Sequence, residues 1–294
     1  MSDVKYAFKK SKIIQGDCLE KMKLIPDKSI DFICCDLPYG MTAPKWDEIL
    51  PADKLWEQYN RIIATDGTIA LFASQPFTTK LISSNEKDYR YVWYWVKNQA
   101  TNFFHAKRMP TRKVEEVVIF KKGKYYPQIT EGHIPTNSAK GCSDGKAYHG
   151  TNKRDYKGGK TTRYPTNLLE FKCVDNYSRI HSAQKPVELI EYLVRTYTDE
   201  FDLVLDNTSG SGTLAEACIN TNRDFVIIEK NPIDFEKGKE RVEKIFKNYG
   251  LDLQPLLDER MLNNLNKKQN ETIKNKYKLC TIYNVVVSVF YFLQ

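Results

Sequence analysis

The amino-acid sequence predicts an α/β fold with a mostly parallel sheet, and two segments carry this prediction. The first is a largely apolar run, residues 29–35, which has the length of a buried strand and ends in Asp36-Leu37-Pro38-Tyr39-Gly40. The second is the apolar run 203–206, which a glycine-rich turn, residues 207–213, joins to a helical stretch, residues 214–219. Strand, glycine-rich turn and helix start form the first half of a nucleotide-binding βαβ unit.

Hydrophobic periodicity predicts the other strands and helices in alternating order. The expected elements are a strand at Ile13-Ile14, a helix over 18–24, the strand over 29–35, a helix over 53–63, strands over 68–72, 91–96 and 116–120, a helix from Lys185-Pro186 to about Tyr197, the 203–219 unit, and a strand over 225–228 that ends at Glu229. Proline is well tolerated in the first turn of a helix, which favours the start at Pro186. A polar, basic connection, residues 97–113, is expected between two of the strands.

The stretch after the first strand carries groups that suit one kind of chemistry. Pro38 biases Leu37 toward an extended conformation, so the Leu37 carbonyl is expected to point out of the strand end. The Asp36 carboxylate and this carbonyl could each accept one hydrogen from an exocyclic amino group, which would aim the nitrogen lone pair at an incoming methyl group. Tyr39 is expected to expose a ring that stacks on a base flipped out of a duplex. The alternative is a strand-to-turn connection in which Pro38 and Gly40 only turn the chain.

The glycine-rich turn predicts an adenosine-containing cofactor. Glu229 follows the turn at about 20 residues, the spacing at which an acidic residue meets ribose hydroxyls. Gly210, Gly212 and Ala215 also satisfy the looser dinucleotide pattern, so this segment leaves both NAD and S-adenosylmethionine open. No Gly-Lys-Ser/Thr follows the turn, which argues against a phosphate-binding NTPase loop.

With His181-Ser182-Ala183-Gln184-Lys185-Pro186 between them, the two segments resemble the DNA amino-methyltransferases that methylate adenine N6 or cytosine N4. The motif order is similar to the circularly permuted β class, in which the catalytic half comes first and the cofactor turn last. The resemblance covers roughly residues 12–246. It implies a Rossmann-like, S-adenosylmethionine-dependent methyltransferase fold, with a mostly parallel sheet, an antiparallel edge hairpin and an inserted target-recognition region.

The resemblance also implies roles for residues at matching positions. Asp36, Leu37, Pro38 and Tyr39 would form the catalytic site that holds the target amine. The implied cofactor-binding residues are Asp17, Lys185, Asp206, Gly210, Gly212 and Glu229. For Asp17, which could accept from the adenine amino group, capping the helix over 18–24 is an equal alternative, and both roles are compatible.

Two positions depart from the family pattern. Members usually carry Asp-Pro-Pro-Tyr, where this chain has Leu37, and a Phe near the cofactor turn, where it has Thr208. Leu37 should do little harm, because the main-chain carbonyl is the group that is used. Thr208 is smaller and polar, so it is expected to pack less well against the cofactor or the flanking helix.

Most of the formal charge of +8 is concentrated in one segment. Residues 121–172 contain eleven Lys and Arg against four Asp and Glu, together with many Tyr, Gly, Asn and Thr. This composition predicts contact with double-stranded DNA, and the candidate DNA-binding residues are Lys153, Arg154, Lys157 and Arg163. A solvated insertion without a partner is the alternative.

The length of 294 residues fits one α/β domain with an insertion. The expected parts are a catalytic half over 1–120, a basic target-recognition insertion over 121–177, a cofactor-binding half over 178–247 and a C-terminal extension over 248–294. Trp46, Asn102, Phe103 and Phe104 could line the base pocket. For each of these aromatic residues, packing in the core is the favoured interpretation, because large apolar side chains are usually buried.

Seven cysteines and four histidines include no Cys-x-x-Cys and no paired His spacing, so no metal site is expected. The odd cysteine count and the lack of a secretory signal favour reduced thiols in a cytoplasmic protein. Residues 251–278 are rich in Asn and Lys and predict a helix with a solvated tail. Residues 285–293 are strand-like and too short to span a bilayer as a helix, so no membrane partner is expected.

The sequence therefore predicts a DNA methyltransferase that uses S-adenosylmethionine and acts on an exocyclic amino group. Adenine N6 is favoured over cytosine N4, because family resemblance associates Asp, rather than Ser, at position 36 with adenine. An NAD-linked oxidoreductase would leave the Asp36 motif unexplained, and an inert nucleic-acid-binding protein would require that Thr208 abolishes cofactor binding. Whether the protein forms a homodimer, and whether it has a companion restriction endonuclease, stay open.

Overall fold

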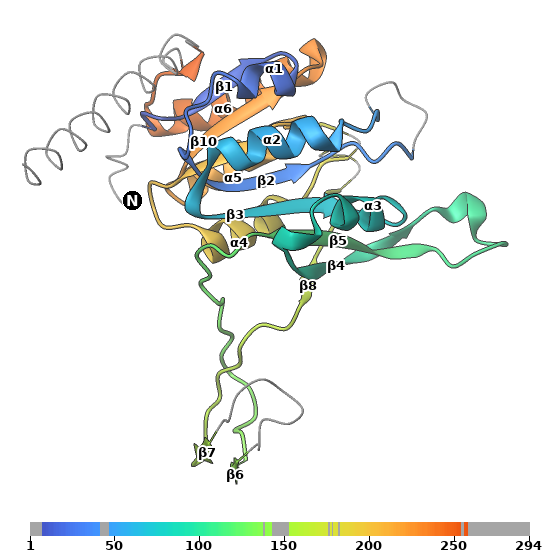
Figure 1. Cartoon of the computed structure of the whole chain (residues 1–294), viewed down its shortest axis with the longest axis vertical. Coiled ribbons are helices and arrows are strands. Elements are labelled where there is room, and N and C mark those ends of the chain that lie inside the picture. Colours follow the sequence, from blue (N-terminus) through green and yellow to red (C-terminus); the bar gives the residue numbers. More distant parts are fainter. Residues whose placement is uncertain are drawn as a thin grey trace, which may run out of the picture.

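A computed structural model of the chain describes residues 8–41, 47–137, 139–142, 153–175, 177, 179–181, 183–253 and 256–257 (Figure 1). Of residues 139–142 and 153–156 it describes the main chain alone. Three predictions lie outside the described residues: the pocket position of Trp46, the strand-like segment over 285–293, and most of the C-terminal extension.

The described part of the chain is built on one eight-stranded sheet with the order β1-β10-β9-β2-β3-β5-β4-β8. Strands β1, β10, β9, β2 and β3 are parallel to one another, β5 is antiparallel to both β3 and β4, and β8 is parallel to β4 at the edge. The bounds are β1 Lys12–Gln15, β2 Ile30–Asp36, β3 Ile63–Ala73, β4 Tyr89–Thr101, β5 Arg112–Phe120, β8 Leu168–Phe171, β9 Leu203–Asp206 and β10 Asp224–Glu229. The mostly parallel sheet with an antiparallel hairpin is thus confirmed, but the hairpin is not at the edge as predicted, because β8 pairs with β4 on its outer side.

In the described part of the chain, six α-helices cover the two faces of the sheet. Strand residues alternate between two apolar clusters: Phe32 and Cys34 pack with α4, α5 and α6, while Ile33 and Cys35 pack with α1, α2 and α3. The bounds are α1 Cys18–Met22, α2 Ala52–Ile62, α3 Phe77–Ser84, α4 Val187–Tyr197, α5 Thr213–Asn220 and α6 Pro232–Tyr249. Among the described residues, no helix is both long and apolar enough to cross a bilayer.

The parallel strands bring four polar residues to the carboxyl-terminal end of the sheet: Gln15, Asp36, Asp206 and Glu229. Gln15 is in register with Glu229, and Ile227, two residues before Glu229, is in register with Asp206. Strand β2 joins this group because its Ile33 is paired with Leu205. The carboxyl ends of β1, β2, β9 and β10 therefore lie side by side, which is where ligands bind in open parallel sheets.

The predicted connection over 97–113 is shorter than expected, because its two ends are strand and only residues 102–111 lie outside the strands. Strand β4 continues to Thr101 and β5 begins at Arg112, so the two form a long antiparallel hairpin closed by a 3-10 turn, η2 (Phe103–His105). The reason is pairing: β4 is bonded to β5 on one side and to β8 on the other, which satisfies its backbone despite the polar sequence. Pro186 is the N-cap of α4 and precedes its first turn.

The basic insertion forms an arm that leaves the body of the protein (Figure 1). The outgoing and returning segments of the arm run antiparallel and are joined by main-chain hydrogen bonds, among them Thr130 N to Arg163 O (3.0 Å) and Arg163 N to Thr130 O (2.9 Å). A two-stranded hairpin, β6 (Ala139–Cys142) with β7 (Lys153–Tyr156), lies at the far end of the arm. The arm is thus held by backbone pairing and adds little to the core.

Candidate active site

The polar strand ends line one cavity of about 1100 Å³. Its walls include Asp17 after β1, residues 36–39 at the end of β2, residues 206–211 after β9, Glu229 at the end of β10, and Lys185 before α4. The two segments singled out in the sequence, 170 residues apart, therefore face the same space. This is the neighbourhood that a transfer from a bound cofactor to a bound acceptor requires.

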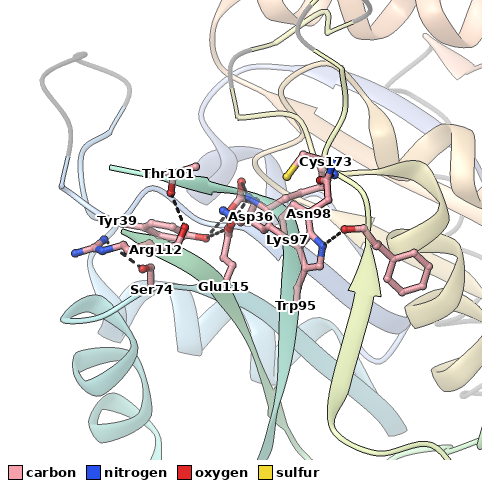
Figure 2. A network of polar contacts seen from close by, with 12 residues as sticks. Asp36, Tyr39, Ser74, Trp95, Lys97, Asn98, Thr101, Arg112, Glu115 and Cys173 are labelled. Carbon is pink, nitrogen blue, oxygen red and sulfur yellow. Dashed lines mark hydrogen bonds and ion pairs between the residues drawn. The ribbon is translucent and has the colours of Figure 1, made fainter. Parts of the chain in front are cut away.

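The Asp36 carboxylate is held from two sides (Figure 2). Its Oδ2 lies 2.5 Å from the Lys185 ammonium, and its Oδ1 accepts a 2.7 Å hydrogen bond from the Tyr39 hydroxyl. The Lys185 ammonium also lies 2.9 Å from Glu115 Oε1, and the Lys97 ammonium lies 2.6 Å from Glu115 Oε2. Two carboxylates and two ammonium groups thus form a closed cluster with no net charge, which we call the Asp36 cluster.

Charge pairing within the Asp36 cluster offsets the cost of burial. Burial raises the pKa of Glu115, but the ammonium groups of Lys185 and Lys97 outweigh it and bring that pKa to about 2. Burial lowers the pKa of the Lys185 ammonium, but the negative charges of Asp36 and Glu115 outweigh burial and hold that pKa above its ordinary value. Burial leaves the pKa of Asp36 raised, although Lys185 counteracts it. Lys185 is therefore the group that keeps Asp36 an acceptor.

The Tyr39 ring is less exposed than the sequence suggests. One side of it stacks on Phe77, with ring centroids 5.2 Å apart and planes at 27°. Its hydroxyl lies 2.7 Å from Asp36 and 3.1 Å from Glu115, and a single proton can be donated to only one of them at a time. The side chain is thus fixed before any base arrives, and the predicted freely exposed ring is corrected to a partly buried one.

Sequence reasoning missed Glu115 and Lys97. Both lie beyond the predicted strand bounds, in the extended parts of β5 and β4. The available signal was a pair of acidic residues, Glu115 and Glu116, that interrupts an apolar strand. For Lys185, the structure shows contacts with carboxylates that the sequence did not predict, and its predicted cofactor contact stays a prediction.

The glycine-rich turn is tied to two neighbouring strands. Glu229 accepts from the Gly210 amide through Oε2 (2.8 Å) and from the Asn231 amide through Oε1 (2.7 Å). The Thr208 hydroxyl donates to the Asp36 carbonyl (3.1 Å), so Thr208 links the turn to the end of β2. Gly212 has φ 72°, and a Cβ there would meet the Gly238 backbone of α6 at 3.2 Å, which explains why glycine stands at this position.

Asp206 is the most perturbed carboxyl of the cofactor side. Burial raises its pKa to about 7 against the hydrogen bond from the Thr208 amide (3.0 Å), and the negative charges of Asp36 and Glu229 add to the rise. Asp17 accepts from the Leu19 amide (3.0 Å), which confirms it as the N-cap of α1, and it also pairs with Lys230 (3.1 Å). Its predicted contact with an adenine amino group remains a prediction.

The candidate DNA-binding residues all lie on the arm, but they are not alike. Lys157 is exposed. The Arg163 guanidinium donates to the carbonyls of Lys160 (3.0 Å), Thr162 (2.9 Å) and Ile134 (2.5 Å), so it links the two antiparallel segments of the arm. Lys153 and Arg154 lie in β7, where their side chains are outside the described residues.

Phe103 and Phe104 do not pack in the core, as their apolar character had suggested. Their exposed fractions are 67% and 102%, at the tip of the β4–β5 hairpin. The reason is their place in the fold, because the hairpin carries its tip beyond every layer that could cover it (Figure 1). Within the described residues, no group of three His, Cys, Asp or Glu side chains could hold a metal ion.

Comparison with protein families gives one match that spans most of the chain. A family model described as DNA methylase, for the N6/N4 methyltransferases, matches residues 30–240. The chain therefore belongs to this family. Membership confirms the predicted family, an S-adenosylmethionine-dependent DNA methyltransferase.

Individual relatives agree with this assignment. The chain is 25% identical over 281 residues to the type II methyltransferase M.HpaI of Haemophilus parainfluenzae, covering 90% of this chain and 83% of the relative. It is 26% identical to the DNA adenine methyltransferase YhdJ of Escherichia coli K12, covering 87% and 90% of the two chains.

Solved structures show the same fold. The complex of M1.HpyAVI with SAM matches with a TM-score of 0.53 and 22% identity, covering 78% of this chain and 98% of that one. The cytosine-N4-specific PvuII DNA methyltransferase matches with a TM-score of 0.56 and 15% identity, covering 91% and 96%. The predicted methyltransferase fold is confirmed.

The residues of the cavity fit S-adenosylmethionine. This cofactor carries a sulfonium and an ammonium group, and the cavity presents Asp206 and Glu229 close enough together to raise the pKa of Asp206. A cationic ligand beside them would relieve that repulsion. The Asp17, Asp206 and Glu229 carboxylates and the turn at Gly210 are the groups that would hold the cofactor.

The raised pKa of Asp206 predicts a pH-dependent effect of Asp206→Asn on the cofactor-free protein. The folded state binds the Asp206 proton more tightly than the unfolded chain, whose carboxyl has a pKa near 3.9. As the pH rises from about 4 to about 7, ionisation of the Asp206 carboxyl therefore lowers the free energy of unfolding. Asn does not ionise, so it has no such effect. We expect D206N to raise the free energy of unfolding at pH 8 by about 1–4 kcal/mol, at about 1.4 kcal/mol per pKa unit, and to give no such gain at pH 4.

Urea unfolding of both proteins at the two pH values measures this difference. Asp66→Asn, at an exposed position of β3, is the matched control and should change stability little at either pH. A D206N protein that is less stable than the parent at pH 8 would contradict the assignment.

Proposed function

We propose that the protein methylates the N6 amino group of adenine within a specific sequence of double-stranded DNA. The observation that carries the proposal is the position of the Asp36 carboxylate, which ends β2 inside the same cavity as the glycine-rich turn. Asp at this position supports adenine over cytosine N4 through the family resemblance. The name of the relative YhdJ, a DNA adenine methyltransferase, points the same way.

The proposed hydrogen bonds to the target amine use acceptors that other residues of the chain already hold in position. A carboxylate offers about four lone-pair sites, and Asp36 uses one for Lys185 and one for Tyr39. Its free sites and the Leu37 carbonyl would each accept one N–H of the target amine. The nitrogen lone pair is then withdrawn from the ring and directed toward the cofactor side of the cavity.

The other residues of the Asp36 cluster position the acceptor. Lys185 keeps Asp36 ionised, so that it accepts and does not donate, and Glu115 with Lys97 holds Lys185 in place. When bound, S-adenosylmethionine supplies an electrophilic methyl group. The Asp36 carboxylate and the Leu37 carbonyl would hold the amine nitrogen while it accepts that methyl group with release of a neutral thioether, and the nitrogen would then lose one proton to water. No side chain has to act as a base.

The proposal extends to partners and place of action. The basic arm would contact the DNA backbone through Lys153, Arg154 and Lys157, while Arg163 maintains the shape of the arm. A homodimer and a companion restriction endonuclease are compatible with type II relatives such as M.HpaI. Among the cysteines whose side chains the structure describes, all are free thiols (Cys18, Cys34, Cys35, Cys173 and Cys218), which supports a reducing cytoplasm as the location.

The product of the reaction tests the proposal directly. DNA incubated with the purified chain and labelled S-adenosylmethionine should contain N6-methyladenine after digestion and mass spectrometry. Asp36→Ala should remove at least about 99% of transfer, since it deletes a preorganised acceptor, and should change cofactor affinity less than threefold. N4-methylcytosine as the product would contradict the choice of base, and a fully active D36A would place the grip on the amine elsewhere.

The positioning role of Lys185 predicts a change in the pH profile. Without the ammonium, burial and the negative charge of Glu115 outweigh the hydrogen bond from Tyr39 and raise the pKa of Asp36 further, so Lys185→Gln should move the acidic limb of the kcat profile to higher pH. We expect kcat to fall about ten- to a hundredfold at pH 7, while cofactor affinity is kept. Lys185→Arg keeps the charge and should retain the parental limb even if K185Q folds poorly. If K185Q folds and the acidic limb of its kcat profile does not move, Lys185 would contribute only to packing.

The arm predicts a change in the salt dependence of DNA binding. Lys153→Ala with Arg154→Ala should reduce the slope of log affinity against log salt by about 0.9 for each phosphate contact that is lost. Lys244→Ala with Lys247→Ala, on α6 outside the arm, is the control and should leave the slope unchanged. Fluorescence anisotropy with a labelled duplex gives the slopes. Equal slopes for the arm variant and the parent would exclude these two residues from the interface.

A further inference from the structure

The β4–β5 hairpin extends the sheet past the cavity. Gln99, Ala100 and Thr101 of β4 line the cavity wall, and the chain then continues outward to the 3-10 turn η2. Figure 1 shows the hairpin tip projecting beyond the sheet on the side to which the chain after β2 also leads. Phe104 is only three residues past Thr101, so it lies at most roughly 10 Å from the rim of the cavity even if the chain were fully extended.

The hairpin tip is internally braced. Thr101 is paired with Arg112 across the base of the tip, and the Arg112 guanidinium reaches Ser74 Oγ at 3.4 Å (Figure 2). Within the tip, the amide of His105 donates to the Asn102 carbonyl (3.2 Å), and the amide of Arg108 donates to the His105 carbonyl (2.8 Å). The tip therefore has a defined shape that its own backbone holds.

This braced tip exposes large apolar side chains among positive charges. Phe104 is fully exposed, and Phe103 and Met109 are 67% and 47% exposed. Leaving a Phe side chain in water instead of burying it forgoes about 1.5–3 kcal/mol. Residues 98–113 also contain four Lys and Arg and no Asp or Glu. An apolar point surrounded by cations is complementary to a duplex, which has stacked bases inside and phosphates outside.

We propose that the β4–β5 tip is a wedge that enters the duplex beside the target base. Phe104 fills the space that the extruded base leaves in the stack, and Lys107 with Arg108 binds the flanking phosphates. Extrusion costs a few kcal/mol of lost stacking and pairing, and insertion of an apolar ring offsets part of that cost. This role rests on the proposed function, because it serves the delivery of the base to the Asp36 cluster.

Two duplexes separate the wedge from the chemistry. In the first the target base is fully paired, and in the second it lies opposite an abasic site, where no pairing opposes extrusion. Phe104→Ala should slow methylation of the paired duplex at least tenfold and of the second duplex less than twofold, with unchanged cofactor affinity. Phe104→Leu should restore most of the rate, because an apolar wedge remains. Phe201→Ala, which alters a 47% exposed Phe before β9, is the matched control and should equal the parent.

Base extrusion can also be measured independently of methyl transfer. A duplex with 2-aminopurine at the target position should become strongly fluorescent when the parent binds and at least fivefold less so with F104A. Equal slowing of F104A on both duplexes, or parental rates on both, would overturn the wedge. A change in sedimentation of F104A with unchanged extrusion would assign the tip to self-association and would also overturn it. A parent chain that extrudes the base but transfers no methyl would instead contradict the proposed function and leave the wedge supported.

Discussion

The ion pair between Asp36 and Lys185 is the interaction on which the rest of the site depends. The two residues are 149 positions apart, and their charged atoms lie 2.5 Å from each other between β2 and the start of α4. Two further charges, on Glu115 and Lys97, complete a neutral cluster at the boundary of the core. Removing one member would leave a buried charge without compensation, which typically costs about 3–5 kcal/mol. The same contacts therefore tie the end of β2 to the start of α4 and set the ionisation of Asp36, the proposed acceptor for the target amine.

The cavity is electrostatically asymmetric, and the asymmetry suits the proposed binding of a neutral base beside a cationic cofactor. On the side of the target amine, negative charge is balanced by lysines, so Asp36 stays ionised without repelling a neutral base. On the side of the glycine-rich turn, burial raises the pKa of Asp206 to about 7, and the negative charges of Asp36 and Glu229 add to the rise. Such a surface favours a cation. Thr208 bonds the cofactor turn to the main chain of Asp36, so the distance between the two sides is constrained by a direct contact.

Much of the fold could be predicted because it is local or repetitive. The parallel strands are short apolar runs, and polar residues mark their carboxyl ends at Asp36, Asp206 and Glu229. The Asp36 cluster could not be predicted in full, because Glu115 and Lys97 lie in strand segments whose polar sequence does not show that they pair. Their conformation depends on tertiary partners, β8 among them. The exposure of Phe104 was missed for a related reason, since apolar character predicts burial only where a neighbouring layer exists to cover it.

The central claim is that the acceptor amine is held by the Asp36 carboxylate and the Leu37 carbonyl. A crystal structure with a target duplex and an unreactive analogue of S-adenosylmethionine measures this most directly. The account predicts an extruded base whose exocyclic nitrogen lies about 2.7–3.2 Å from both oxygens, with Lys185 still paired to Asp36. An extruded base whose amine is bound by other groups, with both oxygens turned away from it, would contradict the account.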